Sequence, residues 1–317
     1  MKRVNNLFEK IVNLDNLRVA DDKAQRGKSK KYGVRLHNLN KEGNLNSLRE
    51  SLLNRTYKTS EYDMFKIYEP KEREIFRLPF YPDRIVHHAI MNVLEPIFIG
   101  CFVKDTYSAI KGRGIHLAAS NLKKVLRDVE GTTYCMKLDI KKFYPNINHE
   151  VLKSLIRRKI KDKDLLWLFD EIITSAPGLP IGNYLSQYLA NFYLTYFDHW
   201  LKEIKGVKYY FRYADDMVIL SSDKEHLHNL LIEIREYLDV NLKLVVKNNY
   251  QIFPVEDRGI DFLGYKFYHT HTLLRKSIKK RFIKAVNKGS SISTIAAYKG
   301  WTDHCDSKNL VRKVLNK

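Results

Sequence analysis

The segment Phe211-Arg212-Tyr213-Ala214-Asp215-Asp216-Met217-Val218-Ile219-Leu220 decides how this chain folds. Its aromatic and β-branched runs, 208–213 and 217–221, predict two strands joined as a hairpin, with Asp215 and Asp216 at the turn. An Asp-Asp pair is also common in ordinary capped turns that face solvent. The strands on both sides favour the other interpretation, in which the hairpin presents its carboxylates at the end of a sheet.

A second stretch, LDIKKFYPNI at 138–147, follows an alternating strand pattern in which Tyr134, Met136, Leu138 and Ile140 share one phase. Asn148 then begins an amphipathic helix, and a further helix is expected over 183–205. After the hairpin, apolar residues between 227 and 238 predict another helix, and 242–247 reads as a last strand. This order predicts an α+β fold with a split βαβ, four-stranded antiparallel sheet that carries helices on one face.

In this topology the end of the first strand lies beside the hairpin, so Asp139 should meet Asp215 and Asp216. Nucleotidyl transfer is catalysed by two cations about 3.5–4 Å apart. Magnesium prefers oxygen ligands, which three converging carboxylates and the backbone carbonyl of Ile140 would supply. The sequence therefore predicts a site for two Mg²⁺ ions, with Mn²⁺ as a substitute, in the palm sheet of a template-dependent polymerase.

These two stretches resemble known motifs. YADD followed by MVIL is similar to the metal-binding box of reverse transcriptases, and LDIKKFYPNI is similar to their first metal-binding motif. The resemblance implies that Asp139 and Asp215 bind metal and that Asp216 supports them. It also implies that Tyr144 is the steric gate that excludes a 2′-hydroxyl, while one of Phe143 and Tyr144 packs in the core. The implied fold is a right-hand polymerase with fingers (1–130), palm (131–255) and a short helical thumb (256–317).

The motif Ile181-Gly182-Asn183-Tyr184-Leu185-Ser186-Gln187 indicates the subclass. Many reverse transcriptases have QG followed by SP here, whereas IGxxxSQ resembles the enzymes of diversity-generating retroelements. The segments at 83–98, 104–108, 111–114, 258–269 and 273–282 extend this resemblance over nearly the whole chain. It departs at YADD, where YMDD is common, and at Ser108-Ala109-Ile110, where an Ala-Cys-Arg-like stretch is expected.

The resemblance implies that Ile181, Gly182 and Gln187 lie at the incoming nucleotide. An aliphatic Ile181 cannot supply the hydrogen bond of a glutamine, which would lower discrimination between correct and incorrect pairs. Simple packing is the alternative role for Ile181.

Further residues are assigned from the same resemblance. Arg73 should bind the triphosphate, with Lys71 or Arg77 as substitutes, and Lys142 should lie near the phosphates. Lys247 should protonate the leaving pyrophosphate. Gly264 is expected in a primer-grip turn, although a simple β-turn is the other interpretation. A basic thumb helix of about 12 residues should bind the RNA–DNA hybrid through Arg275, Lys276, Lys279, Lys280 and Arg281.

Composition agrees with a nucleic-acid partner. The 317 residues include 56 Lys plus Arg and 36 Asp plus Glu, which gives a formal net charge of +20. Residues 21–31 are expected to form an exposed basic arm. Three separated cysteines, no apolar signal core and no long apolar run predict a soluble protein of a reducing cytoplasm. The resemblance to retroelement reverse transcriptases implies that the gene is bacterial or phage-encoded.

The expected partners are template RNA, the cDNA primer and product, dNTPs and a small accessory protein, with no membrane. Three alternatives remain at this point. One is a reverse transcriptase of a retron or an antiphage defence system, and another is a non-catalytic RNA-binding protein with a palm fold. The third, an RNA-dependent RNA polymerase, is disfavoured by the aromatic Tyr144.

Overall fold

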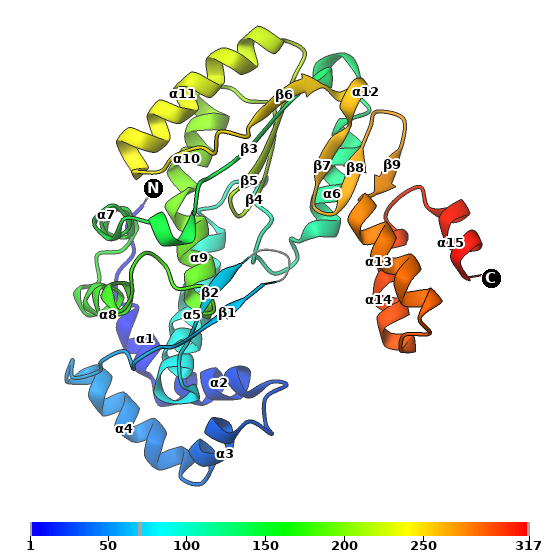
Figure 1. Cartoon of the computed structure of the whole chain (residues 1–317). Coiled ribbons are helices and arrows are strands. Elements are labelled where there is room, and N and C mark those ends of the chain that lie inside the picture. The colour runs from blue at the N-terminus through cyan, green and yellow to red at the C-terminus, as the bar shows by residue number, and fades with distance from the viewer. Residues whose placement is uncertain (1, 69–71, 316–317) are drawn as a thin grey trace. The chain divides into compact units, whose positions relative to one another are not determined.

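The computed structural model describes residues 2–68 and 72–315 (Figure 1). They form two compact units, and each unit is built from three stretches of chain. The first unit contains 1–103, 141–198 and 237–244, and the second contains 104–140, 199–236 and 245–317. Across the described ranges, no helix has the length and apolar character needed to cross a membrane.

The first unit is mostly helical and carries one two-stranded antiparallel hairpin, β1–β2. Its elements are α1 (Phe8–Val12), α2 (Leu14–Gln25), α3 (Tyr32–Asn38), α4 (Lys41–Leu53), β1 (Asp63–Ile67), β2 (Arg73–Arg77), η1 (Phe80–Arg84), α5 (Ile85–Ile99), η3 (Tyr144–Asn146), α7 (His149–Lys159), α8 (Lys163–Thr174) and α9 (Tyr184–Tyr193). As expected, Asn148 caps α7, because its side chain accepts a hydrogen bond of 3.0 Å from the Val151 N–H.

The second unit contains two sheets and the C-terminal helices. Its elements are α6 (Ile115–Val125), η2 (Glu130–Thr132), β3 (Tyr134–Asp139), β4 (Tyr209–Tyr213), β5 (Asp216–Ser221), β6 (Gln251–Pro254), α12 (Val255–Arg258), β7 (Ile260–Phe262), β8 (Tyr265–Phe267), β9 (Thr272–Leu274), α13 (Lys276–Asn287), α14 (Ile292–Thr302) and α15 (Lys308–Leu315). The helix predicted over 183–205 is divided into α9, α10 (Thr195–His199) and the π-helical turn η4 (Trp200–Ile204). The long helix α11 (Lys224–Leu242) follows β5.

The predicted four-stranded antiparallel sheet is confirmed, with strand order β4-β5-β3-β6. The position predicted for the last strand is wrong. Residues 242–247 alternate like a strand, but α11 continues to Leu242, and Val246 makes only an isolated bridge with Ile140. The apolar residues Leu242, Leu244 and Val246 are buried without forming a ladder. The fourth strand is β6, which pairs with β3 from Gln251 to Pro254.

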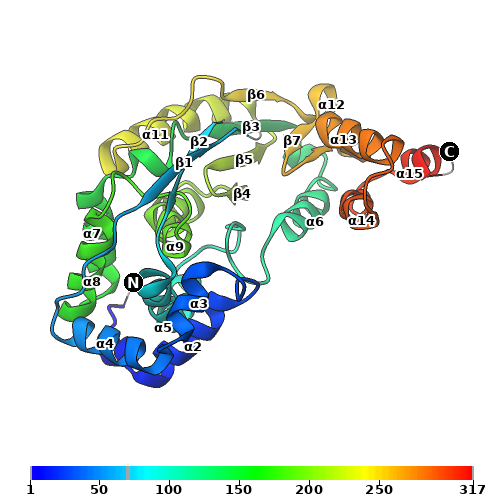
Figure 2. The same ribbon diagram turned by 60° about the horizontal axis from the view of Figure 1, so that its bottom comes forward.

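The central sheet is covered on both faces. Met217, Val218, Ile219 and Leu220 of β5 are all buried, which differs from the alternation of a half-exposed strand. Val218 and Leu220 belong to a core that includes Ala118 and Leu122 of α6 and reaches the β7–β8–β9 sheet. Both ribbon views show α6 beside β7 (Figures 1 and 2).

Two local predictions are corrected. The expected basic arm begins inside α2, which continues to Gln25. Asp21 there is fully buried and accepts from Lys41 Nζ at 2.9 Å, because Ala20 and Ala24 turn this face of the helix into the core. The helix predicted to end near Pro96 continues to Ile99, and Pro96 lies in its last turn.

Candidate active site

Two of the predicted carboxylates face each other across neighbouring strands. Asp139 ends β3 and is the register partner of Asp216, which begins β5. Asp215 lies in the turn just before Asp216, and the preceding residue, Ala214, has a φ of +55°. The sequence-based prediction that the end of the first strand meets the hairpin turn is therefore confirmed.

Arg212 supports this turn from inside the protein. It is fully buried, and its guanidinium donates to the Ala214 carbonyl at 3.1 Å and to Thr106 Oγ1 at 3.4 Å. Its backbone is bonded to Asp105 and Tyr107 of the segment 104–108. A non-glycine residue at positive φ is disfavoured by sterics, so the buried guanidinium offsets part of that cost and fixes the direction of the turn.

The carboxyl groups of this turn have raised pKa values. Burial, together with hydrogen bonding to Asp139 and repulsion by it, raises the pKa of Asp215 to about 7. Burial raises the pKa of Asp216 to about 6, with Lys137 opposing the rise and Asp139 adding to it. Carboxylates crowded in this way favour a bound proton or a bound cation over three free negative charges.

Two lysines approach the carboxylates. Lys247 Nζ lies 2.6 Å from Asp139 Oδ2, and the Lys247 N–H donates to the Asp139 carbonyl at 2.8 Å. Lys137 Nζ lies 3.5 Å from Asp216 Oδ1 and also donates to the carbonyl of Asp261 in β7. The sequence-based assignment placed Lys247 near the site, and the structure brings it there even though its segment is not a strand.

The carboxylates provide oxygens suited to divalent cations. Asp139 Oδ1 and Asp216 Oδ1 are buried and make no hydrogen bond within the described part of the chain. The Asp139 carbonyl is used by Lys247, so by antiparallel alternation the Ile140 carbonyl points to the opposite side of β3. Among the described His, Cys, Asp and Glu side chains, however, no three converge as a complete metal-binding group. The residues therefore fit cations that take further ligands from substrate or water.

The structure separates the roles of two neighbouring aromatic residues in the first unit. Phe143 is buried, whereas Tyr144 is half-buried at the start of η3. The Tyr144 carbonyl accepts from the Leu179 N–H at 2.8 Å, and a Cβ added to Gly178 would lie 2.5 Å from the same oxygen. Phe143 is thus the core residue of the pair.

The Ile181-Gly182-Asn183 loop is tied to the β1–β2 hairpin. The Phe76 N–H donates to the Ile181 carbonyl at 2.8 Å, and a Cβ on Gly182 would lie 2.6 Å from the Phe76 carbonyl oxygen. The buried Asn183 donates to the Tyr62 hydroxyl at 3.0 Å. Glycine is required at 182 by this close backbone approach and by its φ of +125°, while the Ile181 side chain stays half-buried.

The remaining residues assigned to the nucleotide are exposed in the first unit. They are Arg73 at the start of β2, Lys142 in a turn with φ +46°, and Gln187 on α9. Of the two substitutes for Arg73, Arg77 is paired with Asp63, and Lys71 lies outside the described residues. The ion pair with Asp63 makes Arg77 a weaker substitute for Arg73.

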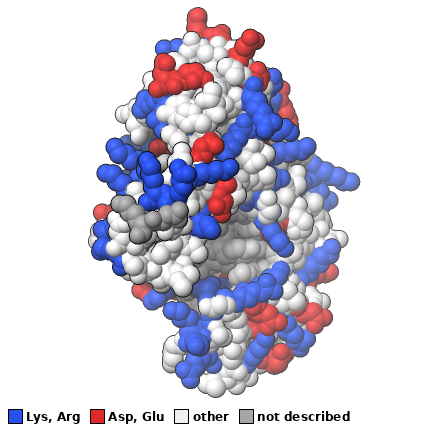
Figure 3. Space-filling model, turned by 90° about the vertical axis from the view of Figure 1, so that its right-hand side faces the viewer, with Lys and Arg blue, Asp and Glu red and all other residues white. Residues whose placement is uncertain are grey.

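Helix α13, at the position expected for a thumb helix, has the predicted length of 12 residues and a strongly basic face. Lys276, Lys279, Lys280 and Arg281 are exposed on α13, whereas Phe282 and Ala285 are buried beneath them. Arg275 differs from this group, because its Nε donates to Asp261 Oδ1 at 2.6 Å. Lys and Arg side chains are spread over the face drawn in Figure 3, with fewer Asp and Glu side chains between them.

Gly264 lies in the turn between β7 and β8, with φ +86° beside Leu263 at +50°. Its carbonyl accepts from the Arg275 N–H at 2.9 Å. The turn is thus a real β-hairpin turn, and it is bonded to the residue that precedes α13.

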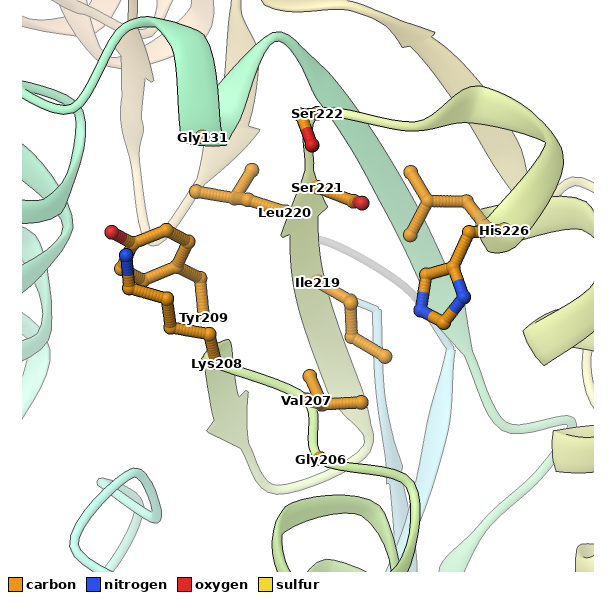
Figure 4. Close-up of a pocket in the computed structure, with 11 residues that line it drawn as sticks. Gly131, Gly206, Val207, Lys208, Tyr209, Ile219, Leu220, Ser221, Ser222 and His226 are labelled. Atoms are coloured by element: carbon orange, nitrogen blue, oxygen red, sulfur yellow. The ribbon is translucent and has the colours of Figure 1, made fainter.

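A separate cavity of about 270 Å³ lies at the other end of the β4–β5 hairpin (Figure 4). Its lining includes Lys208 and Tyr209 at the start of β4, Ser221 and Ser222 after the middle of β5, and His226 of α11. Asp215 and Asp216 are at the opposite, turn end of the β4–β5 hairpin, so this cavity is not part of the carboxylate site.

Sequence reasoning missed three supporting residues. Lys137 precedes Asp139 by two positions, and the period of a strand would have placed both on one face. Arg212 carried a signal as a charged residue within an apolar strand. The contact of Asn183 with Tyr62 joins distant parts of the sequence and left no local signal.

A family model described as "Reverse transcriptase (RNA-dependent DNA polymerase)" matches residues 70–267. Protein YkfC of Escherichia coli K12 is 26% identical over 280 residues, which cover 73% of this chain and 71% of YkfC. The group II intron-encoded protein LtrA of Lactococcus lactis is 29% identical over 139 residues, 40% of this chain and 23% of LtrA.

The fold is also similar to that of a solved telomerase. The structure of apo telomerase from Candida tropicalis superposes with a TM-score of 0.50 at 11% sequence identity, over 72% of this chain and 52% of that one. At this identity the likeness concerns the fold alone. The chain therefore spans about half of the telomerase and less than a quarter of LtrA.

Proposed function

The chain belongs to the reverse transcriptase family of RNA-dependent DNA polymerases, and on this premise we propose that it copies a template RNA into cDNA by two-metal nucleotidyl transfer. The observation that carries the proposal is the pairing of Asp139 with Asp216 across β3 and β5, with Asp215 in the adjoining turn and raised pKa values at Asp215 and Asp216. Asp139 Oδ1 is buried and accepts no hydrogen bond within the described part of the chain. A non-catalytic RNA-binding protein would have no use for such an electrostatically costly arrangement.

Asp139 and Asp215 would hold the cations, two Mg²⁺ or in their place Mn²⁺, with the Ile140 carbonyl as a further ligand and Asp216 supporting the pair. Bound there, the ions would activate the primer 3′-oxygen and neutralise the leaving pyrophosphate. Lys247 is the proposed proton donor to that pyrophosphate, since its ammonium already lies within the carboxylate cluster. Arg73 and Lys142 are the proposed triphosphate ligands.

Tyr144 is the proposed steric gate against ribonucleotides. The burial of Phe143 and the partial exposure of Tyr144 support this choice between the two rings. Tyr144→Ala should therefore raise ribonucleotide incorporation relative to deoxynucleotides by about tenfold or more, as expected when a clash is removed. Single-nucleotide incorporation with each substrate measures the ratio. An unchanged ratio would assign Tyr144 to packing.

At a finer level, we propose that the enzyme serves the mutagenic retrohoming of a diversity-generating retroelement. The IGxxxSQ motif supports this subclass, and the half-buried Ile181 has no polar group for the incoming nucleotide. Gly182 and Gln187 complete the proposed nucleotide site. Because one polar contact is absent, the enzyme should misincorporate often. The resemblance to diversity-generating retroelements implies that the errors fall mostly opposite template adenines.

Ile181→Gln tests this idea directly. It should lower the error frequency several-fold on the same RNA template, as judged by sequencing the cDNA, with extension retained. The Phe76 N–H can donate to the carbonyl of residue 181 whichever side chain that residue carries, so the substitution should leave the local fold intact. Leu179→Met, a core change in the same segment, is the matched control. An unaltered error spectrum would place infidelity elsewhere or with a partner.

The proposed partners are template RNA, the primer and cDNA product, dNTPs and a small accessory protein, in a bacterial or phage-infected cytoplasm. A retron or antiphage reverse transcriptase is the competing subclass. A template and variable repeat pair beside the gene would favour the retroelement, and a structured non-coding RNA would favour the alternative. Variants at Ile181 should be assayed with and without any small protein encoded nearby.

A further inference from the structure

The turn at Leu263-Gly264 is enclosed by the C-terminal helices. A Cβ added to Gly264 would lie 2.8 Å from Ile278 Cδ1 of α13 and 3.0 Å from Trp301 Cη2 of α14, with Trp301 Cζ3 closer still. Real Cβ atoms essentially never come within 3.0 Å of such neighbours. The α-carbon face of Gly264 is therefore occupied by the indole of Trp301 and is unavailable for a close approach by the primer.

Several further contacts fix the same junction. The Tyr265 hydroxyl donates to the Trp301 carbonyl at 3.1 Å, and the rings of the two residues lie 5.5 Å apart. The Gly264 carbonyl accepts from the Arg275 N–H, which begins the approach to α13. Tyr265 is fully buried, so this end of the hairpin is part of the core.

The β9 end of the small sheet is attached to the same helices. The Thr272 N–H donates to Asp306 Oδ2 at 2.8 Å, and the Asp306 N–H donates to the Thr272 carbonyl at 2.8 Å. Asp306 lies between α14 and α15. The hairpin is thus joined to the helices at two places, and Trp301 is the large side chain at the one next to the turn.

We propose that Trp301 is a positioning residue that fixes the primer-grip turn to the helical thumb, so that turn and thumb hold the primer as one body. The inference rests on the proposed function, because it assumes that the turn and α13 contact a primer–template duplex. It changes the reason for glycine at 264: the missing side chain makes room for the indole rather than for the primer.

This role predicts a selective defect. When the indole is removed, the turn and the basic face of α13 can shift against each other, which weakens their joint hold on the duplex. The carboxylates are untouched, so the rate of a single incorporation at saturating primer–template should stay within about twofold. Primer–template affinity should fall about tenfold, the size expected when an aromatic contact is removed, and products should become shorter when rebinding is blocked by a trap.

The experiment compares full-length Trp301→Phe, Trp301→Ala and Gly264→Ala proteins with wild type on a primed RNA template. Gly264→Ala is expected to reproduce the defect with Trp301 present, because its methyl group displaces the indole and is also strained at positive φ. Trp167→Ala is the matched control, since Trp167 is another half-buried tryptophan, on α8 of the first unit. Thermal melting monitors folding, and Trp301→Phe keeps the test valid if the alanine variant unfolds.

The double variant Gly264→Ala/Trp301→Ala supplies the decisive readout. If the two residues act through one contact, the double variant loses no more affinity than the worse single variant. Fully additive losses would overturn the proposal, as would wild-type product lengths in Trp301→Phe and Trp301→Ala, or an equal loss in the single-incorporation rate. If the wild-type protein itself extends no primer, the proposed function fails instead, and that outcome is seen before any variant is compared.

Discussion

Two hairpin turns in the second unit have a similar backbone conformation but different surroundings. Each has a non-glycine residue at positive φ, Ala214 in the β4–β5 turn and Leu263 in the β7–β8 turn. In the first turn, Asp215 and Asp216 are half-buried beside the like charge of Asp139, and Asp216 Oδ1 is buried and accepts no hydrogen bond within the described residues, although Lys137 Nζ lies 3.5 Å away. In the second turn, the Gly264 carbonyl accepts a hydrogen bond and its α-carbon face is packed by Trp301.

The difference is consistent with a separate proposed role for each turn. Polar groups that a protein buries without partners usually serve a ligand, because they lower stability until the ligand arrives. A turn whose carbonyl is bonded and whose surface is packed contributes to rigidity. Substitutions in the first turn should therefore affect chemistry, and substitutions around the second should affect how the nucleic acid is held.

The largest expected effect is at Asp215. Asp215→Asn keeps the shape of the turn but removes a charge from the cation site, so primer extension should fall by at least about a thousandfold. RNA affinity should stay close to that of wild type, because the basic surface is unchanged. Gel-based extension and filter binding measure the two quantities, with Asp257→Asn on α12 as the control. Primer extension by Asp215→Asn at the wild-type rate would contradict the proposed role of the first turn in the chemistry.

A second prediction concerns the stability cost of the first turn. The folded protein holds the Asp216 proton more tightly than the unfolded chain does, since its pKa is raised from 3.8 to about 6. The associated stability is present below about pH 4 and is lost as pH rises through about 6. Asp216→Asn mimics the protonated acid and should raise the free energy of unfolding of the metal-free protein by about 1–2 kcal/mol at pH 7.

That range is below the ~3 kcal/mol that two pKa units would give, because the Asp216 side chain is 30% exposed. Urea unfolding in a chelating buffer at pH 5 and pH 7.5 would measure the effect. The gain should be larger at the higher pH. A destabilising effect, or the same gain at both pH values, would contradict the electrostatic account of the turn.

The smallest effect is expected for the basic helix α13, which is proposed to hold the nucleic acid. Replacing Lys279 and Lys280 with Gln should weaken binding of primed RNA template and reduce the slope of log K against log salt by about 0.7–0.9 for each phosphate that is no longer neutralised. Single incorporation at saturating template should persist. A paired change at two exposed lysines outside the thumb, Lys224 and Lys243, is the control. An unaltered slope would remove α13 from the nucleic-acid interface.

Local sequence was sufficient for the parts of the fold that repeat with a clear period. The β4–β5 hairpin, the Asn148 cap and the 12-residue basic helix were predictable because each is set by neighbouring residues. The conformation of residues 242–247 was not predictable. Leu242, Leu244 and Val246 alternate as in a strand, but they are buried at the end of a helix and in the irregular segment that follows it. Register with a distant partner, here Ile140, decides such cases.

The candidate site, like the fold, could be predicted only in part from the sequence. Asp139, Asp215 and Asp216 could be assigned from motif and topology, because strand order alone brings them together. The surroundings of these carboxylates could be assigned only in part: Lys247 was expected near the site, whereas the support that the buried Arg212 gives the turn depends on its contact with the distant Thr106. Trp301 lies beyond local prediction for the same reason: its contact with Gly264 exists only in the folded chain.

The most direct test of the account is extension of a DNA primer on an RNA template, with dNTPs and rNTPs compared in the presence of Mg²⁺ and after its removal by a chelator. We expect cDNA synthesis with dNTPs, strong discrimination against rNTPs, and a loss of product on chelation that is reversed when Mg²⁺ is restored. Wild-type protein that yields no more product than Asp215→Asn, or that prefers rNTPs, would contradict the assignment of this carboxylate turn as the centre of an RNA-directed DNA polymerase.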